Sequence, residues 1–576
     1  MRRTATAVLV AIALLGAGSA LSAAHATSGN GPECDWPMYG RDLAHSFNAP
    51  DECTTLSALT APSITPRWGM LTTDSLTASP TVVDGVAYAG DWTGKLYAVP
   101  VDQAGPAAPT WTFEIDDPNA VAFGRIVSSA SVTTIDDTKV VIFGGGATLY
   151  VLDAATGDEL TRLCLDPRLD DHTVGGRCKG THAGQQVEVE SSPAVIAAAT
   201  SAQVVVGLDV HNDKDVGRTG VVSSTLAHDA EDGWTFVPEW KFDPEGDGPG
   251  DPDGVTYSGD GLLTAGSGTG WGCASVWGSP AVDVEHRLAF FGTGSCGSPG
   301  IEVGEDAWAV DLDTGALAWR FDTPRVNEDW DDDYGASPNL LPGDLVGFGS
   351  KDGSYYAFDR QTGSRAWTAH VGESGHVTDG FAVGGIIGTP AVGDVGDEPA
   401  IFATTALSTP IYEPLDEGHP QFWFDQSLAE DPLRMLSLTA FDAADGHILW
   451  RAPLSRQSYG APTYSNGVLL VPSTFSAQLL AFQADTGALL SVMPTAGASS
   501  SSPTVVGDTI YLGAGTRTSD LEFKAFGASF FDAYLGASPL SPASGLFAYT
   551  ILAPDVVDVP TTVPRLPVAP FGPLLP

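Results

Sequence analysis

The chain contains 576 residues, with 26 Lys and Arg against 71 Asp and Glu, which gives a formal net charge of −45. This charge argues against nucleic acid and anionic lipid as partners, because both carry the same sign of charge. Hydrophobic residues make up 43% of the chain, which excludes wholesale disorder, and the 67 Gly and 41 Pro residues favour an all-β fold over a helical one.

The first 26 residues have the pattern of a secretion signal. Arg2 and Arg3 precede an apolar run, and Ala24-His25-Ala26 is a small-x-small cleavage pattern. We therefore expect an exported protein (secreted, periplasmic or at the cell surface), with an uncleaved anchor as the alternative for this segment. No later stretch reaches the ~18 apolar residues of a membrane span, so no span is expected in the mature chain.

All six cysteines lie in the part that would be exported, in three local groups. An oxidising compartment permits disulfides. Nearest-neighbour pairing is the simplest of the many connectivities, and it would join Cys34 to Cys53, Cys164 to Cys178 and Cys273 to Cys296. The chain has no CxxC and no CxxCH sequence, which argues against a cysteine metal site and excludes a c-type haem attachment site.

A short phrase recurs along the chain. Weak copies lie at 96–99, 151–157 and 220–240, clear copies at 309–319, 357–367 and 440–450, and further weak copies at 481–487 and 546–549. Each clear copy has β-forming residues, a turn with glycine in a left-handed conformation, and a second strand with Trp, which together predict a hairpin.

Hairpins repeated in this way bury both faces by stacking radially, which predicts an eight-bladed β-propeller over residues 34–552. The repeat averages about 64 residues, longer than the ~40–45 of an ordinary blade, so long loops are expected. The last segment, 553–576, is rich in proline and is expected to form an extended or disordered tail.

The phrase Ala-x-Asp-x-x-Thr-Gly-x-x-x-Trp resembles the tryptophan-docking motif of eight-bladed quinoproteins, the PQQ-dependent alcohol dehydrogenases. The opening Asp35-Trp36-Pro37-Met38-Tyr39-Gly40-Arg41-Asp42 looks like the start of that propeller, most of all in its polyvinyl-alcohol dehydrogenase branch. The resemblance implies PQQ as cofactor, with Ca²⁺ or a lanthanide beside it. The motif indicates the fold and leaves the activity open, because propellers without catalytic activity share it.

The resemblance also implies residues that would bind the cofactor. Arg125 lies in a segment similar to one that pairs with a cofactor carboxylate. Ser191 and Ser192, next to Glu190, stand where the family offers a hydroxyl to another carboxylate. Trp277 matches the tryptophan that forms the floor under the planar cofactor, and a flat π-face suits that role. An ordinary blade or loop role is the alternative for each.

Further along the chain, Asn327 to Tyr334 resembles the family's catalytic segment. By that match Asp331 is the carboxylate that takes the alcohol proton, and Asp333 stands where lanthanide-using members carry an extra ligand. Lys351 matches the basic residue that bonds the quinone oxygens. A solvated acidic loop and an ordinary hairpin lysine are the alternatives.

The metal ligands are matched less closely. Asp215 fits the family's glutamate best, with Asp213 as the other candidate, and Ser295 stands where an asparagine is expected. Together with Asp331 and Asp333 they form the implied Ca²⁺ or lanthanide site. The family's adjacent-cysteine disulfide and fused haem domain have no counterpart in this sequence.

Two functions remain open from the sequence. The first is an exported dehydrogenase that oxidises a small or polymeric alcohol, such as polyvinyl alcohol, by hydride transfer to PQQ, with a separate electron acceptor such as a cytochrome c. The second is a secreted scaffold or binding propeller that holds no quinone. The matches at Trp277, Asp331 and Lys351 favour the first.

Overall fold

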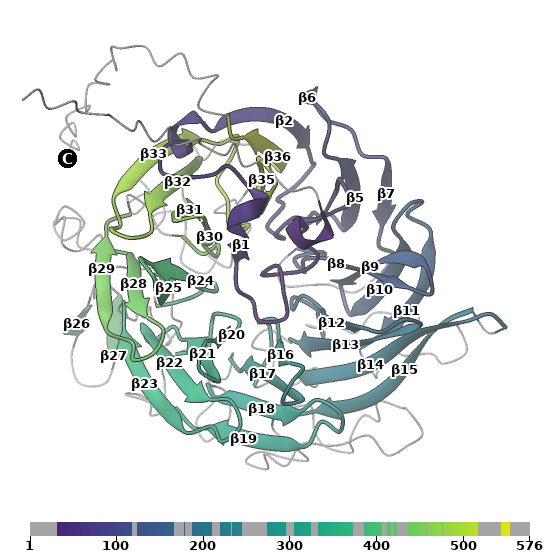
Figure 1. Cartoon of the computed structure of the whole chain (residues 1–576). Helices are drawn as coiled ribbons and strands as arrows, with labels where there is room; N and C mark the ends of the chain where they lie inside the picture. Colours follow the sequence, from purple (N-terminus) through teal and green to yellow (C-terminus); the bar gives the residue numbers. More distant parts are fainter. Residues whose placement is uncertain are drawn as a thin grey trace, which may run out of the picture.

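In the computed structural model, eight β-sheets are arranged in a ring around a central axis (Figure 1). We call the space between the innermost strands the channel. The structure describes residues 31–117, 124–165, 178, 187–209, 219–231, 233–244, 274–294, 305–323, 332–372, 385–405, 436–454, 458–474, 476–515 and 543–552, and the backbone of 412–415 and 419–422. The predicted eight-bladed all-β propeller is confirmed. No helix in these segments is long and apolar enough to cross a membrane.

Blades 1 to 4 each contain four strands, which follow one another from the channel outward. Blade 1 comprises β3 (Thr81–Val83), β4 (Val86–Gly90), β5 (Lys95–Pro100) and β7 (Trp111–Glu114). Blade 2 comprises β8 (Ser131–Ile135), β9 (Thr138–Gly145), β10 (Thr148–Asp153) and β11 (Glu159–Cys164). Blade 3 comprises β12 (Ala194–Ala197), β13 (Ser201–Leu208), β14 (Gly220–Asp229) and β15 (Gly233–Phe242). Blade 4 comprises β16 (Ala281–Asp283), β17 (Leu288–Gly292), β18 (Ala307–Asp311) and β19 (Leu317–Phe321).

Blades 5 to 7 repeat this order. Blade 5 comprises β20 (Asn339–Leu341), β21 (Leu345–Gly349), β22 (Ser354–Asp359) and β23 (Arg365–His370). Blade 6 comprises β24 (Ala391–Val395), β25 (Glu398–Thr404), β28 (Leu438–Asp442) and β29 (Ile448–Ala452), and a separate hairpin, β26 (Tyr412–Leu415) with β27 (His419–Phe422), lies between its middle strands in sequence. Blade 7 comprises β30 (Thr463–Ser465), β31 (Val468–Pro472), β32 (Gln478–Gln483) and β33 (Leu489–Pro494), with β1 (Asn48–Ala49) beside β30.

Blade 8 contains strands from both halves of the chain. Its inner strands are β34 (Thr504–Val506), β35 (Thr509–Ala514) and β36 (Gly545–Thr550), and its fourth strand is β2 (Thr65–Leu71), followed by β6 (Gly105–Pro106). Three short 3₁₀ helices complete the N-terminal region: η1 (Pro32–Cys34), η2 (Asp51–Cys53) and η3 (Ala61–Ser63). The antiparallel pair β2–β36 therefore closes the ring.

The predicted docking motif joins neighbouring blades. Trp240, in the outer strand of blade 3, donates its indole N–H to the carbonyl of Leu312 in blade 4 at 2.9 Å. Its ring lies against Gly315, which has φ of +68° and where an added Cβ would meet the ring at 2.7 Å. Asp311 begins this turn by accepting backbone N–H bonds from Asp313 and Thr314. Equivalent indole–glycine contacts join Trp111 to Gly157, Trp319 to Gly363, Trp367 to Gly446 and Trp450 to Gly487.

Hydrophobic clusters lie between the faces of adjacent blades. One of them joins Phe290 and Trp319 of blade 4 to Phe348 and Phe358 of blade 5. Burial of apolar surface contributes about 25 cal/mol per Å². The apolar surface buried at each junction therefore stabilises the ring as a whole. The ring places the start of every innermost strand at one end of the channel.

A candidate cofactor site at one mouth of the channel

Hydroxyl groups join the starts of the innermost strands. At each of eight equivalent positions, one residue before a Pro or Ala, the backbone N–H of one blade faces the side chain of the next. Seven such bonds of 2.9 to 3.1 Å are present. We call these positions the hydroxyl belt: Ser79, Ser129, Ser192, Ser279, Ser337, Thr389, Ala461 and Ser502. Ala461 is the one belt position without a hydroxyl.

The residues two positions before the belt line the mouth of the channel. They are Thr77, Val127, Glu190, Trp277, Gly335, Ile387, Tyr459 and Ser500. All except Gly335 are partly exposed, although most of the residues around them are buried. The belt register therefore identifies a ring of mouth residues that contains the predicted Trp277 and, from blade 7, Tyr459.

Lys351 and Trp277 meet at this mouth. The Lys351 ammonium lies 5.6 Å from the centroid of the Trp277 ring, within cation–π range. The same ammonium donates to Oδ2 of Asp333 at 2.7 Å, and Lys351 N–H donates to the carbonyl of Asp333 at 2.8 Å. Asp333 is 1% exposed and Lys351 8% exposed, so this is a buried ion pair. Two residues predicted from separate motifs, Lys351 and Trp277, are thus brought together, with Asp333 beside them.

The surroundings of this ion pair are acidic. Asp352, next to Lys351, has a raised pKa, mainly because it is buried and partly because of the charge of Asp332. Tyr459 has a pKa raised above its usual value by burial, and the Lys351 charge opposes that shift. Tyr459 is also one of the mouth residues in the belt register.

Three carboxylates cluster on blade 3, at the same end of the channel. Oxygen atoms of Glu188, Glu190 and Asp209 lie within 4.8 Å of one another. Glu188 and Asp209 exchange backbone hydrogen bonds of 2.9 and 3.0 Å, and Val276, beside Trp277, donates to the carbonyl of Leu208 at 3.0 Å. The donor set consists of carboxylate oxygens, which are the ligands that Ca²⁺ and lanthanide-like hard cations prefer.

This carboxylate cluster was not predicted from the sequence. Asp209 lies four and six residues before Asp213 and Asp215, the ligands predicted in place of the family's glutamate. The alternation Val187-Glu188-Val189-Glu190 indicates that Glu188 and Glu190 lie together, because residues i and i+2 of an extended segment share one face. Asp213, Asp215, Ser295 and Asp331 lie outside the described residues, as do Cys273 and Cys296.

The side chains of Arg125, Ser191 and Ser192 form hydrogen bonds with backbone groups of the propeller. The Arg125 guanidinium donates to the backbone carbonyls of Thr93, Ile115 and Asp117. Ser191 Oγ accepts the Gly207 N–H, and Ser192 Oγ is the belt acceptor for Ser129. Both serines are buried. These contacts account for the conformation of each side chain, and their predicted bonds to cofactor carboxylates remain predictions.

Two of the predicted disulfides are present. Cys34 is bonded to Cys53, and Cys164 to Cys178. The second bond lies near the predicted cofactor arginine, because the Sγ atom of Cys178 contacts the carbonyl of Ala147, and Gly146 donates its N–H to the carbonyl of Arg125.

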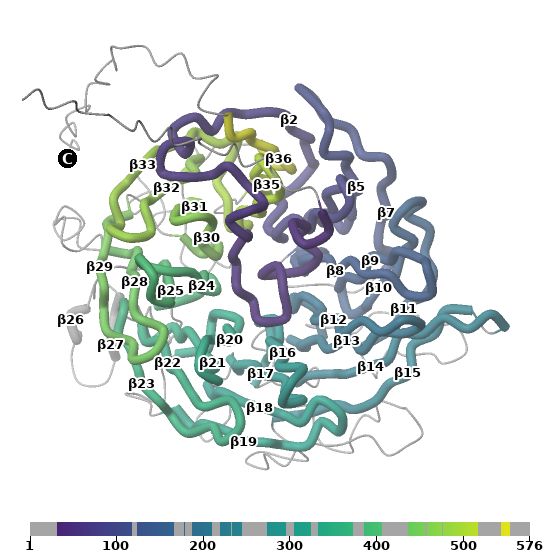
Figure 2. The backbone as a smooth tube through the Cα atoms, viewed as in Figure 1, coloured from purple at the N-terminus to yellow at the C-terminus, as the bar shows by residue number. Residues whose placement is uncertain are grey.

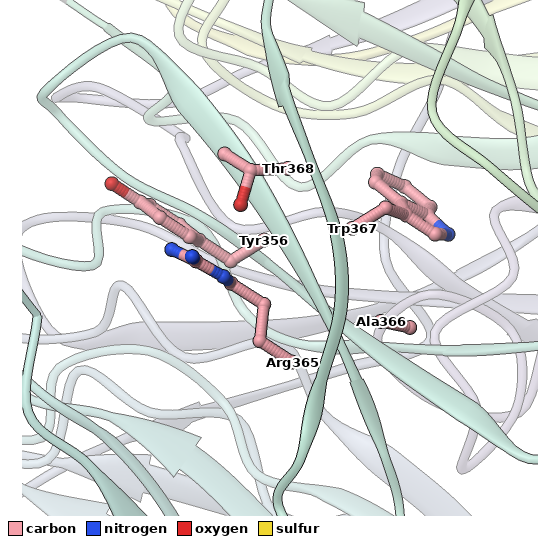
Figure 3. Close-up of a pocket in the computed structure, with 5 residues that line it drawn as sticks. All are labelled: Tyr356, Arg365, Ala366, Trp367 and Thr368. Carbon is pink, nitrogen blue, oxygen red and sulfur yellow. The ribbon is translucent and has the colours of Figure 1, made fainter.

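A shallow depression lies away from this mouth, on the outer strand of blade 5. Figure 3 shows Arg365 beside Tyr356, with Trp367 on the opposite side of the strand. Trp367 is the docking residue for Gly446, and none of the charged groups of the mouth lines the depression. The depression therefore shares no residue with the candidate site at the mouth.

Comparison with known proteins identifies the family. A family model described as the glucose/ethanol/alcohol dehydrogenase β-propeller domain, PQQ, matches residues 58–374, more than half of the chain. The chain belongs to this PQQ dehydrogenase propeller family. A second model, for the outer membrane protein assembly factor BamB, matches residues 434–525 of this PQQ-family chain.

Individual relatives of this PQQ propeller are distant. A quinohemoprotein alcohol dehydrogenase of Comamonas testosteroni is 24% identical over 361 residues, which cover 57% of this chain and 45% of that protein. The chain thus matches about half of that relative's length.

Two solved structures share the fold of the PQQ propeller. One is a quinohemoprotein alcohol dehydrogenase of Pseudomonas putida HK5, with TM-score 0.61, 17% identity and coverage of 90% of this chain and 80% of that one. The other is a europium-containing methanol dehydrogenase, with TM-score 0.63, 16% identity, and coverage of 90% and 98%.

Proposed function

We propose that this protein is an exported PQQ-dependent dehydrogenase that oxidises an alcohol. The observation that carries the proposal is the placement of Lys351, 2.7 Å from Asp333 and 5.6 Å from the centroid of Trp277. A fixed cation beside a flat, partly exposed aromatic face suits a planar anionic ligand. Membership of the PQQ family and the solved alcohol and methanol dehydrogenases of the same fold support it.

The chain's own groups fit a quinone and its metal ion in different parts of the mouth. Trp277 would provide the floor, and Lys351, fixed by Asp333, would bond the quinone oxygens and favour their more negative reduced form. Glu188, Glu190 and Asp209 offer carboxylate oxygens to a hard cation. PQQ, when bound, supplies a two-electron acceptor for the hydride of an alcohol.

The proposed proton acceptor is Asp331, which immediately precedes the described segment that carries Asp333. A carboxylate at this position would remove the hydroxyl proton from the alcohol. Asp215, Ser295, Asp331 and Asp333 remain the proposed metal ligands from the resemblance, and the blade 3 carboxylates join them as candidates. The substrate would be a small or polymeric alcohol, and a separate acceptor such as a cytochrome c would take the electrons.

Reconstitution tests this proposal. Residues 27–576 are purified from an oxidising compartment, and PQQ with Ca²⁺ or a light lanthanide is titrated in while quinone absorbance and dye reduction are followed with an alcohol panel. We expect binding and turnover, loss of turnover in Asp331→Ala, and at least tenfold weaker binding in Lys351→Met, because one charge-assisted hydrogen bond contributes ~1.5–3 kcal/mol.

The matched control is Lys139→Met, which removes an exposed lysine paired with Asp84 and should leave binding unchanged. Failure of wild-type protein to bind PQQ with either metal would overturn the enzyme proposal. It would favour the second function, a secreted propeller that serves as a scaffold or binding protein.

A further inference from the structure

The N-terminal strap, residues 31–53, covers the end of the channel opposite the mouth. Six inner strands donate a backbone N–H to it, each from the residue three positions after the belt, with distances of 2.8 to 2.9 Å. The donors are Val82, Val132, Val282, Leu340, Val392 and Tyr464. Figure 2 shows the purple strap crossing the centre of the ring. One segment of chain thus contacts the inner strands of blades 1, 2, 4, 5, 6 and 7.

Tyr39 extends from the strap to the belt. Its hydroxyl lies 2.9 Å from the Thr389 hydroxyl. Burial raises the pKa of Tyr39, and the hydrogen bond to the Thr389 hydroxyl opposes that shift. The phenol therefore reaches the part of the belt that borders Ala461, the position without a hydroxyl.

The two hydroxyls beside Tyr39 hold segments of the candidate site. Ser337 Oγ accepts the N–H of Ser279, two residues after Trp277. Ser337 also lies four residues after Asp333, and its own N–H is fixed by Thr389 Oγ1. A shift of Ser337 would therefore be transmitted to Trp277 on one side and to the Asp333–Lys351 pair on the other.

The strap is anchored on both sides of Tyr39. Cys34 and Cys53 form a disulfide that closes it into a loop. Between them Arg41, His45 and Phe47 have φ of 78°, 54° and 47°. Such conformations cost of order 1–3 kcal/mol each, so they persist only where surrounding contacts hold them. The Tyr39 ring itself packs edge-on against His45 and Phe47, with centroids 5.2 and 5.1 Å away.

We propose that Tyr39 is a positioning residue for the candidate site. It reaches the belt from the strap end of the channel, on a strap that the Cys34–Cys53 disulfide holds closed. Its hydroxyl bonds to the Thr389 hydroxyl, which accepts the Ser337 N–H. Through these two residues it fixes the placement of Trp277 and the Asp333–Lys351 pair. The part that concerns cofactor binding rests on the proposed function, whereas the placement of Trp277 does not.

The test uses Tyr39→Phe and the double variant Cys34→Ser/Cys53→Ser. The control is Tyr88→Phe, which removes another buried phenol hydroxyl whose contact, the carbonyl of Ala154, lies far from the belt. Each protein is labelled with fluorotryptophan, and the Trp277 signal is assigned by its loss in Trp277→Phe. Amide hydrogen exchange is followed for peptides covering 274–283, 332–341 and 385–392.

For Tyr39→Phe we expect a shifted or broadened Trp277 signal and at least tenfold faster exchange in the three peptides, with the thermal midpoint within a few degrees of wild type. The double cysteine variant should give the same pattern with a larger loss of stability, and Tyr88→Phe should give neither change.

An unchanged Trp277 signal and unchanged exchange in Tyr39→Phe would overturn the proposal, whatever happens to stability. If wild-type protein binds PQQ, Tyr39→Phe should also weaken that binding severalfold. If wild-type protein binds none, the proposed function fails, and the fluorine and exchange results still decide the role of Tyr39.

Discussion

The two ends of the central channel are built from different chemistry. At the strap end, the contacts are backbone hydrogen bonds, a disulfide, the buried rings of Trp36 and Phe47, and the partly buried ring of Tyr39. At the mouth, side chains carry charge: Glu190 is partly exposed, and Lys351 and Asp333 form a buried ion pair. Both ends are formed by the same short inner strands, only a few residues apart.

One fold thus keeps the contacts that hold the ring apart from the side chains that carry charge. Backbone bonds at the strap end depend little on side-chain identity, so they fix the ring without using functional groups. At the mouth, each blade contributes one residue in the same register. These eight residues are all of different types. Burying a charged pair there is costly unless the partners stay matched. Substitutions at each end therefore test this division.

The largest effect is expected from Lys351→Met. It would leave Asp333, 1% exposed, as a buried carboxylate without its ammonium partner. Breaking one side of a buried pair costs about 3–5 kcal/mol, which urea denaturation would detect as a lower free energy of unfolding.

Two variants sharpen that result. Adding Asp333→Asn to Lys351→Met should recover much of the loss, because the unmatched charge is removed. Lys139→Met, at an exposed pair, should cost no more than ~1 kcal/mol. Equal losses in Lys351→Met and Lys139→Met would show that the mouth is no more sensitive than the surface.

The strap end should show an acid-sensitive stability through His45. Burial lowers the pKa of His45 to about 4, and its Nδ1 lies 2.9 Å from the carbonyl of Pro338. The unfolded chain, with a pKa near 6.5, binds the proton more tightly than the folded one. The contribution of neutral His45 to the free energy of unfolding is therefore complete above about pH 6.5. It falls by about 3 kcal/mol as the pH falls towards 4.

Denaturation at several pH values compares wild type with His45→Asn, since asparagine tolerates the φ of 54° and does not titrate. Between pH 7 and pH 4 the wild type should lose about 3 kcal/mol more than the variant. Parallel curves would mean that His45 is not buried as a neutral ring.

The smallest effect is expected at the belt. Ala461→Ser supplies a hydroxyl at the remaining belt position, next to Thr389 of blade 6. One added hydrogen bond contributes ~0.5–1.5 kcal/mol, so a slightly higher thermal midpoint is expected. Lower stability would indicate that the space beside Tyr39 does not admit a hydroxyl.

The sequence predicted the repeating parts of this structure well. Strands and turns follow local rules, so the repeats predicted the eight-bladed propeller. The resemblance to the tryptophan-docking motif implied junctions of the Trp240–Gly315 type. Two nearest-neighbour disulfides, Cys34–Cys53 and Cys164–Cys178, were also correct.

The contacts between blades were harder to predict. Nothing local in the sequence shows that Tyr39 meets Thr389, 350 residues away, or that Glu188 and Asp209 lie side by side. The (Ser/Thr)-Pro pairs at the inner strands were visible in the sequence, but their joining into a belt depends on closure of the ring. Lys351 and Trp277 were found because a family motif marks each of them separately.

The shared blade has a consequence for how the molecule is made. Strand β2 begins at Thr65, and its partner β36 ends at Thr550, so the pair that closes the ring joins nearly the first and the last strands synthesised. Contacts so distant along the chain form slowly. Until β36 emerges, β2 and β35 both lack the strand that pairs with them, so a chaperone that shields strand edges during synthesis or export would act on this protein within that interval.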